Sequence, residues 1–66
     1  MIADKKKVQL FMARACMNAN DISKVAQMPA GSVKAVLAGR NVLPRTLGRV
    51  ARALNCDVAQ IIVEEE

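Results

Sequence analysis

The sequence predicts an all-α protein, a compact bundle of five short helices. Apolar residues recur at spacings of three and four, which is the period of one face of an α-helix. Prolines, glycines and helix-capping residues separate these stretches, so the connecting loops are short. A chain of 66 residues has room for one small hydrophobic core, and we expect a single domain over residues 1–66.

The first helix is expected over residues 5–17. Asp4 can cap it, because a carboxylate accepts hydrogen bonds from the free N–H groups of a first helical turn. The spacing predicts an inner face of Val8, Phe11, Met12 and Ala15.

Residues 18–39 predict two short helices joined by a tight corner. Asn18 begins the second helix, and Asp21 three residues later can complete a capping box. The two inner stripes share one spacing and consist of Ile22, Val25 and Ala26, then Val33, Val36 and Leu37. Met28 precedes Pro29 and is therefore disfavoured in helical geometry, so the corner falls at this point.

The third helix is expected from Ala30 to Gly39, a residue that commonly ends helices. A fourth helix should follow over residues 44–54, with an inner face of Leu47, Val50, Ala51 and Leu54. Asn55 can end it in left-handed geometry. Asp57 and Gln60 can then cap a short fifth helix with the apolar residues Val58, Ile61 and Ile62.

Positive charge dominates all but the last residues of the chain. The net charge is +4, and it rises to +7 when the three glutamates of residues 64–66 are left out. A basic body with an acidic tip indicates a polyanionic partner, with nucleic acid as the first candidate. Simple solubility is the alternative explanation.

Catalysis and metal binding have little support in the sequence. The chain has no histidine, and Asp4, Asp21 and Asp57 each stand at a capping position. Cys16 and Cys56 are too few for a zinc site, and we interpret them as two small thiols in the core. We therefore expect no enzymatic activity and no cofactor.

The apolar runs are only a few residues long, too short to cross a bilayer. No apolar segment follows the first lysines that would resemble a signal peptide. We expect a cytoplasmic protein without membrane contact, associated with the nucleoid when it is bound to DNA.

Two stretches of the chain resemble a known family. They are DISKVAQMPAGSVKAVLAGRN and LPRTLGRVARALNCDVAQII, and their joint order and spacing are similar to the Cro and lambda-repressor superfamily of helix-turn-helix proteins, also called the XRE type. The resemblance covers residues 5–62. It implies a five-helix lambda-repressor-like DNA-binding domain with its helix-turn-helix at about residues 18–39.

The chain departs from the family pattern at four positions. Pro29 replaces the usual Ser or Thr cap of the third helix, and Gln27 replaces a Gly that is favoured in the turn. Ser23 stands where a small Ala is expected, and Ala19 stands where a Gln often contacts the DNA backbone.

The resemblance implies that the third helix lies in the major groove of double-stranded DNA. The residues expected to contact DNA are Ala30, Gly31, Ser32 and Lys34 on that helix, Arg40 and Asn41 after it, Ala19 and Asn20 at the start of the second helix, and Arg45 on the fourth. Only Ser32 and Lys34 of the third helix can hydrogen-bond a base edge through a side chain. The lysines of residues 5–7 either reach flanking phosphates or form a solvated face. Arg49 and Arg52 are expected to face solvent or the acidic tail of a partner.

The sequence is compatible with two functions. The first is a sequence-specific transcriptional regulator, a repressor that acts by occupying its operator. The second is a protein-interaction module that keeps the helix-turn-helix fold without specific DNA binding. Single-stranded nucleic acid is a weaker third candidate, because the chain has one Phe and no Tyr or Trp for stacking bases. By resemblance, a homodimer is expected through the C-terminal helix, with its contact among Ile61, Ile62 and Val63. One of these three should pack inward, and a residue left outside would be the apolar contact. The alternative is that all three cover the core of the monomer.

Overall fold

The computed structural model describes residues 1–63, and the acidic segment 64–66 lies outside the described residues. Within residues 1–63 the chain forms four α-helices and one short 3₁₀ helix: α1 (Lys5–Ala15), α2 (Ala19–Ala26), α3 (Ala30–Leu37), α4 (Pro44–Ala53) and η1 (Val58–Gln60). This part of the chain has no β-strand, only two isolated bridges. A compact, mostly helical domain without strands is therefore confirmed for these residues.

The helix caps read from the sequence are present. The Asp4 carboxylate accepts hydrogen bonds from the N–H groups of Lys6 at 3.0 Å and Lys7 at 3.3 Å. Asn18 and Asp21 form a full capping box, in which each side chain accepts from the backbone N–H of the other at 2.9 and 3.0 Å. These bonds satisfy donors that a helix start otherwise leaves without partners.

Helix α1 ends two residues earlier than the sequence suggests. Cys16 takes a left-handed conformation with φ of 54°, and the Met17 N–H then donates to the Met12 carbonyl at 3.0 Å. Because the chain turns away here, Ala15 and Cys16 are exposed, so their assignment to the core is wrong. Cys56 is half-buried.

The corner between α2 and α3 is held by Ser23. Gln27 adopts a left-handed φ of 55°, and the Met28 N–H donates to the Ser23 carbonyl at 3.1 Å. The Ser23 hydroxyl returns a second bond to the Met28 carbonyl at 2.6 Å. Two hydrogen bonds between the same two residues close the corner ahead of Pro29.

The core is formed mainly by the predicted apolar stripes. Its fully or nearly buried residues are Ala3, Val8, Ile22, Met28, Val33, Val36, Leu47, Val50, Ala51, Leu54 and Ile61. All four residues predicted for the inner face of α4 belong to this set. Val25 does not, because it is 60% exposed while its neighbour Ala26 packs against the core. The two-turn α2 buries its Ile22 side, and Val25 lies outside that narrow contact.

A 3₁₀ helix stands in place of the expected fifth α-helix. Its hydrogen bonds span three residues, from the Gln60 N–H to the Asp57 carbonyl at 2.9 Å and from Ile61 to Val58 at 3.0 Å. The Gln60 side chain accepts from the Asp57 N–H at 2.9 Å, as the capping pattern predicts. The helix ends after one turn because the following residues pair with the start of the chain.

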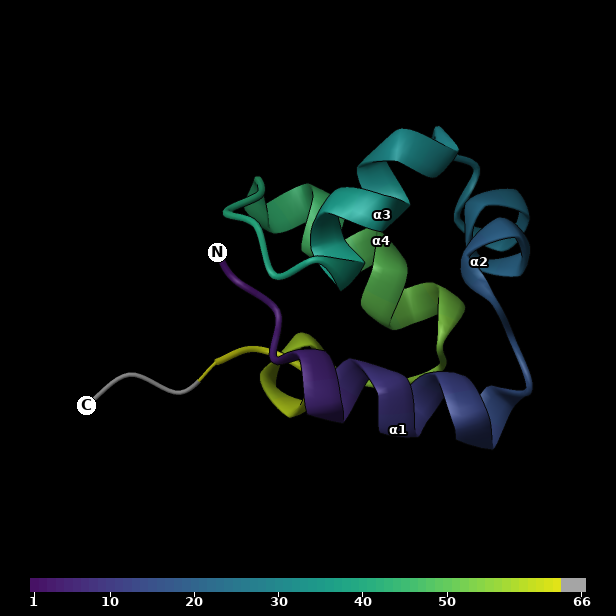
Figure 1. Cartoon of the computed structure of the whole chain (residues 1–66), viewed down its shortest axis with the longest axis horizontal. Coiled ribbons are helices and arrows are strands. Elements are labelled where there is room, and N and C mark those ends of the chain that lie inside the picture. Colours follow the sequence, from purple (N-terminus) through teal and green to yellow (C-terminus); the bar gives the residue numbers. More distant parts are fainter. Residues whose placement is uncertain (64–66) are drawn as a thin grey trace.

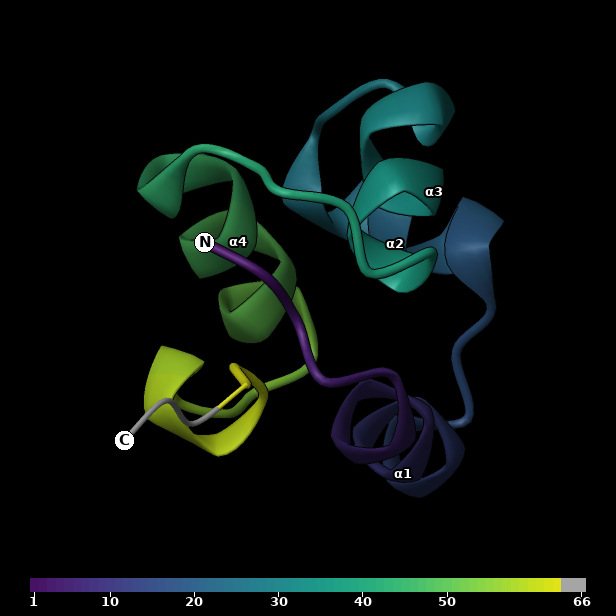
Figure 2. The same ribbon diagram turned by 60° about the vertical axis from the view of Figure 1, so that its left-hand side comes forward.

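Residues 1–3 run between two other segments. The Val42 N–H donates to the Met1 carbonyl at 2.8 Å, and the Val63 N–H donates to the Ile2 carbonyl at 3.0 Å. Figure 1 shows this first segment between the loop that follows α3 and the C-terminal part of the described chain. Figure 2 views α1 almost end-on, on the opposite side of the molecule from α3. The first segment thus connects the two sides of the domain.

Candidate nucleic-acid interface

Helix α3 buries one face and leaves the other open. Val33 and Val36 are fully buried against the rest of the core. The opposite face carries Gly31, Lys34, Ala35 and Ala38, at the helical spacing of three and four residues, and these residues line a shallow hollow together with Arg40. Figure 1 shows α3 beside α2 in the upper part of the view, on the side of the domain away from α1.

The hollow has a floor of small residues and two cations beside it. Lys34 and Arg40 are exposed, whereas Ala35 is half-buried. A Cβ atom added at Gly31 would meet nothing within 4 Å. Packing within the protein therefore does not require a glycine at position 31, and the missing side chain leaves room for a partner that approaches from outside.

Lys5 lies close to the end of α3, although it starts α1. Gly39 has a positive φ of 78°, and a Cβ placed there would lie 3.1 Å from Lys5 Cε. The Lys5 stem therefore crosses Gly39, immediately before Arg40. Sequence spacing gave no indication of this contact, because Lys5 and Gly39 are far apart along the chain.

Asn41 is partly engaged within the protein. Its Oδ1 atom accepts a hydrogen bond from the Met1 ammonium group at 2.6 Å. The side chain is exposed, so the amide NH₂ is the part of Asn41 that can donate to a phosphate or a base. If Asn41 contacts DNA as the sequence predicts, it would do so as a hydrogen-bond donor through its side-chain amide.

The start of α2 is a weaker anion site than the sequence suggests. The Ala19 side chain packs against the core and Asn20 is exposed. Free N–H groups at a helix start favour an anion. Asp21, however, holds its carboxylate in the same first turn, where it accepts from the Asn18 N–H, and this negative charge opposes a phosphate.

Arg45 lies beside the start of α3. It lines a second hollow with Pro29 and Ser32 on one side and Thr46 on the other, and Arg49 borders the same hollow. Both arginines are exposed. Positive charge therefore lies at each end of α3, with Arg45 at its N-terminal end and Arg40 with Lys5 at its C-terminal end.

The predicted dimer contacts at the C-terminal end are only partly accessible. Ile61 is fully buried, and its carbonyl accepts from the Asp4 N–H at 2.7 Å, so this residue is not free to meet a second chain. Ile62 is half-buried, and Val63 is 41% exposed. Ile61 is therefore the residue of the three that packs inward, beside the start of the chain, and it is removed from the candidate dimer contacts.

Comparison with known proteins adds no relative. No protein-family model matches the chain, and searches of curated proteins and of solved structures find no significant match. Among residues 1–63, no helix has the length and apolar character that crossing a bilayer requires.

Proposed function

We propose that this protein is a sequence-specific double-stranded DNA-binding regulator, with α2 and α3 as a lambda-repressor-like helix-turn-helix. The observation that carries the proposal is the open outer face of α3, with Lys34 on it and cations at both ends. The major groove of B-DNA, about 12 Å wide, admits an α-helix. Ten Lys and Arg residues against three Asp give residues 1–63 the charge that such a partner requires.

The small residues of α3 suit a close approach to base edges. Gly31 and Ala35 allow the helix backbone to come near the floor of the groove. Lys34 can then donate to the O6 and N7 acceptors of guanine, the Ser32 hydroxyl can bond a neighbouring base, and the Ala30 methyl can contact a thymine. Few side-chain contacts are available, so DNA shape would supply part of the specificity.

The flanking cations would fix the position of α3 along the duplex. Arg40 and Lys5 would contact phosphates at one edge of the groove, and Arg45 would do so at the other. Two copies on DNA would present α3 about 34 Å apart, one turn of B-DNA. Occupying an operator in this way would exclude RNA polymerase, which makes repression the expected effect. The proposed activity is binding, without a catalytic step or a cofactor.

A protein-interaction module is the second candidate, favoured by two exposed apolar side chains. Val25 and Leu43 are each 60% exposed and border hollows beside Arg49. Large exposed apolar side chains that are surrounded by polar residues are characteristic of protein–protein contacts.

Selection from a random duplex pool followed by binding measurements distinguishes the two functions. We expect the wild-type protein to enrich a defined site, and Lys34→Ala to lower the ratio of specific to random-sequence affinity about tenfold, equivalent to about 1.4 kcal/mol. Fluorescence anisotropy at two salt concentrations measures both affinities. Lys24→Ala is the matched control, because it removes an exposed lysine of α2 that does not line the α3 hollow.

Two results would contradict the proposal. If no duplex is enriched and none binds at low salt, the interaction module is the better explanation. If Lys24→Ala and Lys34→Ala lower the specificity ratio equally, the outer face of α3 is not the reading surface.

A further inference from the structure

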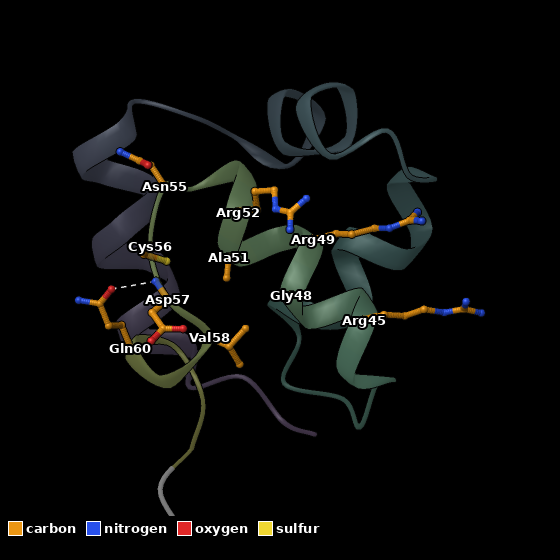
Figure 3. Close-up of a pocket in the computed structure, with 10 residues that line it drawn as sticks. All are labelled: Arg45, Gly48, Arg49, Ala51, Arg52, Asn55, Cys56, Asp57, Val58 and Gln60. Carbon is orange, nitrogen blue, oxygen red and sulfur yellow. Dashed lines mark hydrogen bonds between the residues drawn. The ribbon is translucent and has the colours of Figure 1, made fainter.

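Helix α4 carries a row of arginines that the proposed DNA interface does not use in full. Arg45, Arg49 and Arg52 are exposed and follow the spacing i, i+4, i+7. They border a groove of about 790 Å³ between α4 and the η1 segment, whose other lining residues include Cys56, Val58 and Gln60. We call this surface the arginine groove. Figure 3 shows the arginine side chains on one side of it and the η1 residues on the other.

The three aspartates of the chain each stand at the start of a helix. Asp4 and Asp21 cap α1 and α2, and Asp57 stands at the start of η1, on the far side of the groove from Arg49 and Arg52. The other acidic residues are the three consecutive glutamates of residues 64–66. Three adjacent negative charges thus belong to the same chain as a row of three positive charges.

The two charged segments are of comparable length. Residues seven apart on a helix are separated by about 10 Å along its axis. The first and last of three consecutive residues can lie about 7 Å apart, and the long side chains of Arg and Glu can span the remaining difference. Successive side chains of an extended segment point to opposite faces, so two of the three glutamates can face α4 together. Arg favours carboxylates because its planar group can donate two parallel hydrogen bonds.

The direction of the chain at Val63 argues against ion pairs between the arginines and the glutamates of the same copy. The Val63 N–H is bonded to the Ile2 carbonyl, which ties this part of the chain to the first segment. In Figure 3 the described chain ends at the bottom of the view, well apart from the guanidinium groups of Arg49 and Arg52.

We propose that the arginine groove binds residues 64–66 of a second copy, so that two copies exchange their acidic segments. A two-fold axis makes the exchange reciprocal and doubles the number of ion pairs. Val63 directly precedes the exchanged segment, and Ile2 is bonded to Val63. Both residues are 41% exposed and can be covered in the same contact. The inference concerns association of the free protein and does not depend on DNA binding.

Exposed ion pairs are weak and are screened by salt. Dimerisation should therefore be modest at low ionic strength, about 0.03 M, and should disappear at about 0.5 M, where the screening length is only a few ångströms. Sedimentation velocity at both salt concentrations measures the dimer dissociation constant of the whole chain without DNA.

Charge reversal on each side of the contact provides the decisive test. One variant carries Arg49→Glu and Arg52→Glu, and the other carries Glu64→Lys, Glu65→Lys and Glu66→Lys. We expect each variant alone to dimerise at least about tenfold more weakly than the wild type at low salt. An equimolar mixture should regain association, because each groove then meets a segment of opposite charge in both directions.

The control variant carries Lys6→Glu and Lys24→Glu, which changes the net charge as much as the double arginine variant does without touching the groove. It should dimerise like the wild type, and circular dichroism checks that every variant folds. The proposal is overturned if the wild type stays monomeric at low salt, if the single variants associate normally, or if the mixture remains monomeric. The last result would indicate that the segment binds the groove of its own chain or neither groove.

Discussion

Ser23 illustrates how one side chain can fix the angle between two helices. Its hydroxyl donates to the Met28 carbonyl at 2.6 Å, and its own carbonyl accepts from the Met28 N–H. Gln27 between them occupies a left-handed conformation that costs a non-glycine residue about 1–2 kcal/mol. The paired bonds to Ser23 offset part of that cost, which explains how the corner tolerates Gln27 where glycine is more usual.

Replacing Ser23 tests this role directly. Ser23→Ala should lower the free energy of unfolding by about 1 kcal/mol, because the Met28 carbonyl loses a half-buried hydrogen-bond donor. Urea denaturation followed by circular dichroism measures the change. Ser32→Ala is the control, since no side-chain hydrogen bond is assigned to that serine. Equal stability of the two variants would refute the role of the Ser23 hydroxyl.

The two cysteines should differ in reactivity. Burial raises the pKa of the Cys56 thiol, and the neighbouring Asp57 carboxylate raises it further. Because the thiolate is the reactive form, iodoacetamide should modify exposed Cys16 well before Cys56 at pH 8, as peptide mass spectrometry can measure. Asp57→Asn should shift the pH profile of Cys56 modification toward lower pH, because it removes the negative charge that raises the pKa of the thiol.

The same shift gives a dependence of stability on pH. The pKa of Cys56 is higher in the folded protein than in the unfolded chain, so folding favours the protonated thiol. This contribution is complete below the unfolded pKa and is lost as the pH rises through the folded pKa. In the iodoacetamide experiment, equal modification of Cys16 and Cys56 at pH 8 would contradict the burial of Cys56.

Helix α3 combines a buried face with an outer face of small residues. Val33 and Val36 attach it to the core, while Gly31 meets nothing within 4 Å. A glycine in a helix lowers stability relative to alanine by up to about 1 kcal/mol. Packing offers no reason for this cost at Gly31, whereas close approach to a partner does.

Gly31→Ala should therefore separate stability from binding. The free energy of unfolding should rise by up to about 1 kcal/mol. Affinity for the selected duplex should fall about tenfold, because the new methyl group would collide with the major groove of the DNA. Gly48→Ala in α4 is the matched control. This variant should also be more stable than the wild type, because alanine favours the helix and the new Cβ would make only an ordinary 4.0 Å contact with Val58. Its affinity for a duplex that carries one half-site should equal that of the wild type. Unchanged binding by Gly31→Ala would argue against close approach at α3.

At the scale of the whole molecule, residues 1–3 connect segments that are far apart in the sequence. Met1 bonds to residues 41 and 42 on one side, and Ile2 bonds to Val63 on the other, where the neighbouring Asp4 bonds to Ile61. Ala3 is 2% exposed at this junction, beside the start of α1. A domain with so small a core depends on each such contact, because its total stability is only a few kcal/mol.

Enlarging Ala3 tests the importance of this junction. Ala3→Val should lower the free energy of unfolding by about 1–3 kcal/mol, since two added methyl groups do not fit a closely packed site. Thermal and urea unfolding measure the loss. Ala13→Val on the exposed face of α1 is the control and should cost only about 0.5 kcal/mol through helix propensity. Similar losses for both variants would show that the junction is loosely packed.

Local signals in the sequence determined where the helices of this protein begin and which side of most of them is buried. The capping box of Asn18 and Asp21 and the stripe from Leu47 to Leu54 depend on contacts within one or two turns, so a short window of sequence contains the necessary information. The charged residues proposed to contact DNA were also found in this way, because charge and helix position can be read locally.

Only the tertiary structure decided which of these residues share a surface. Val25 was assigned to the core from its spacing but is exposed. Of the three candidates Ile61, Ile62 and Val63 for a dimer contact, Ile61 is the one that is buried, beside the start of the chain. Lys5 reaches Gly39, and Arg45 lies beside Ser32, through contacts between separate elements. Periodicity gives the faces of a helix but not the width of the surface that covers it, and this width depends on the packing of the whole chain.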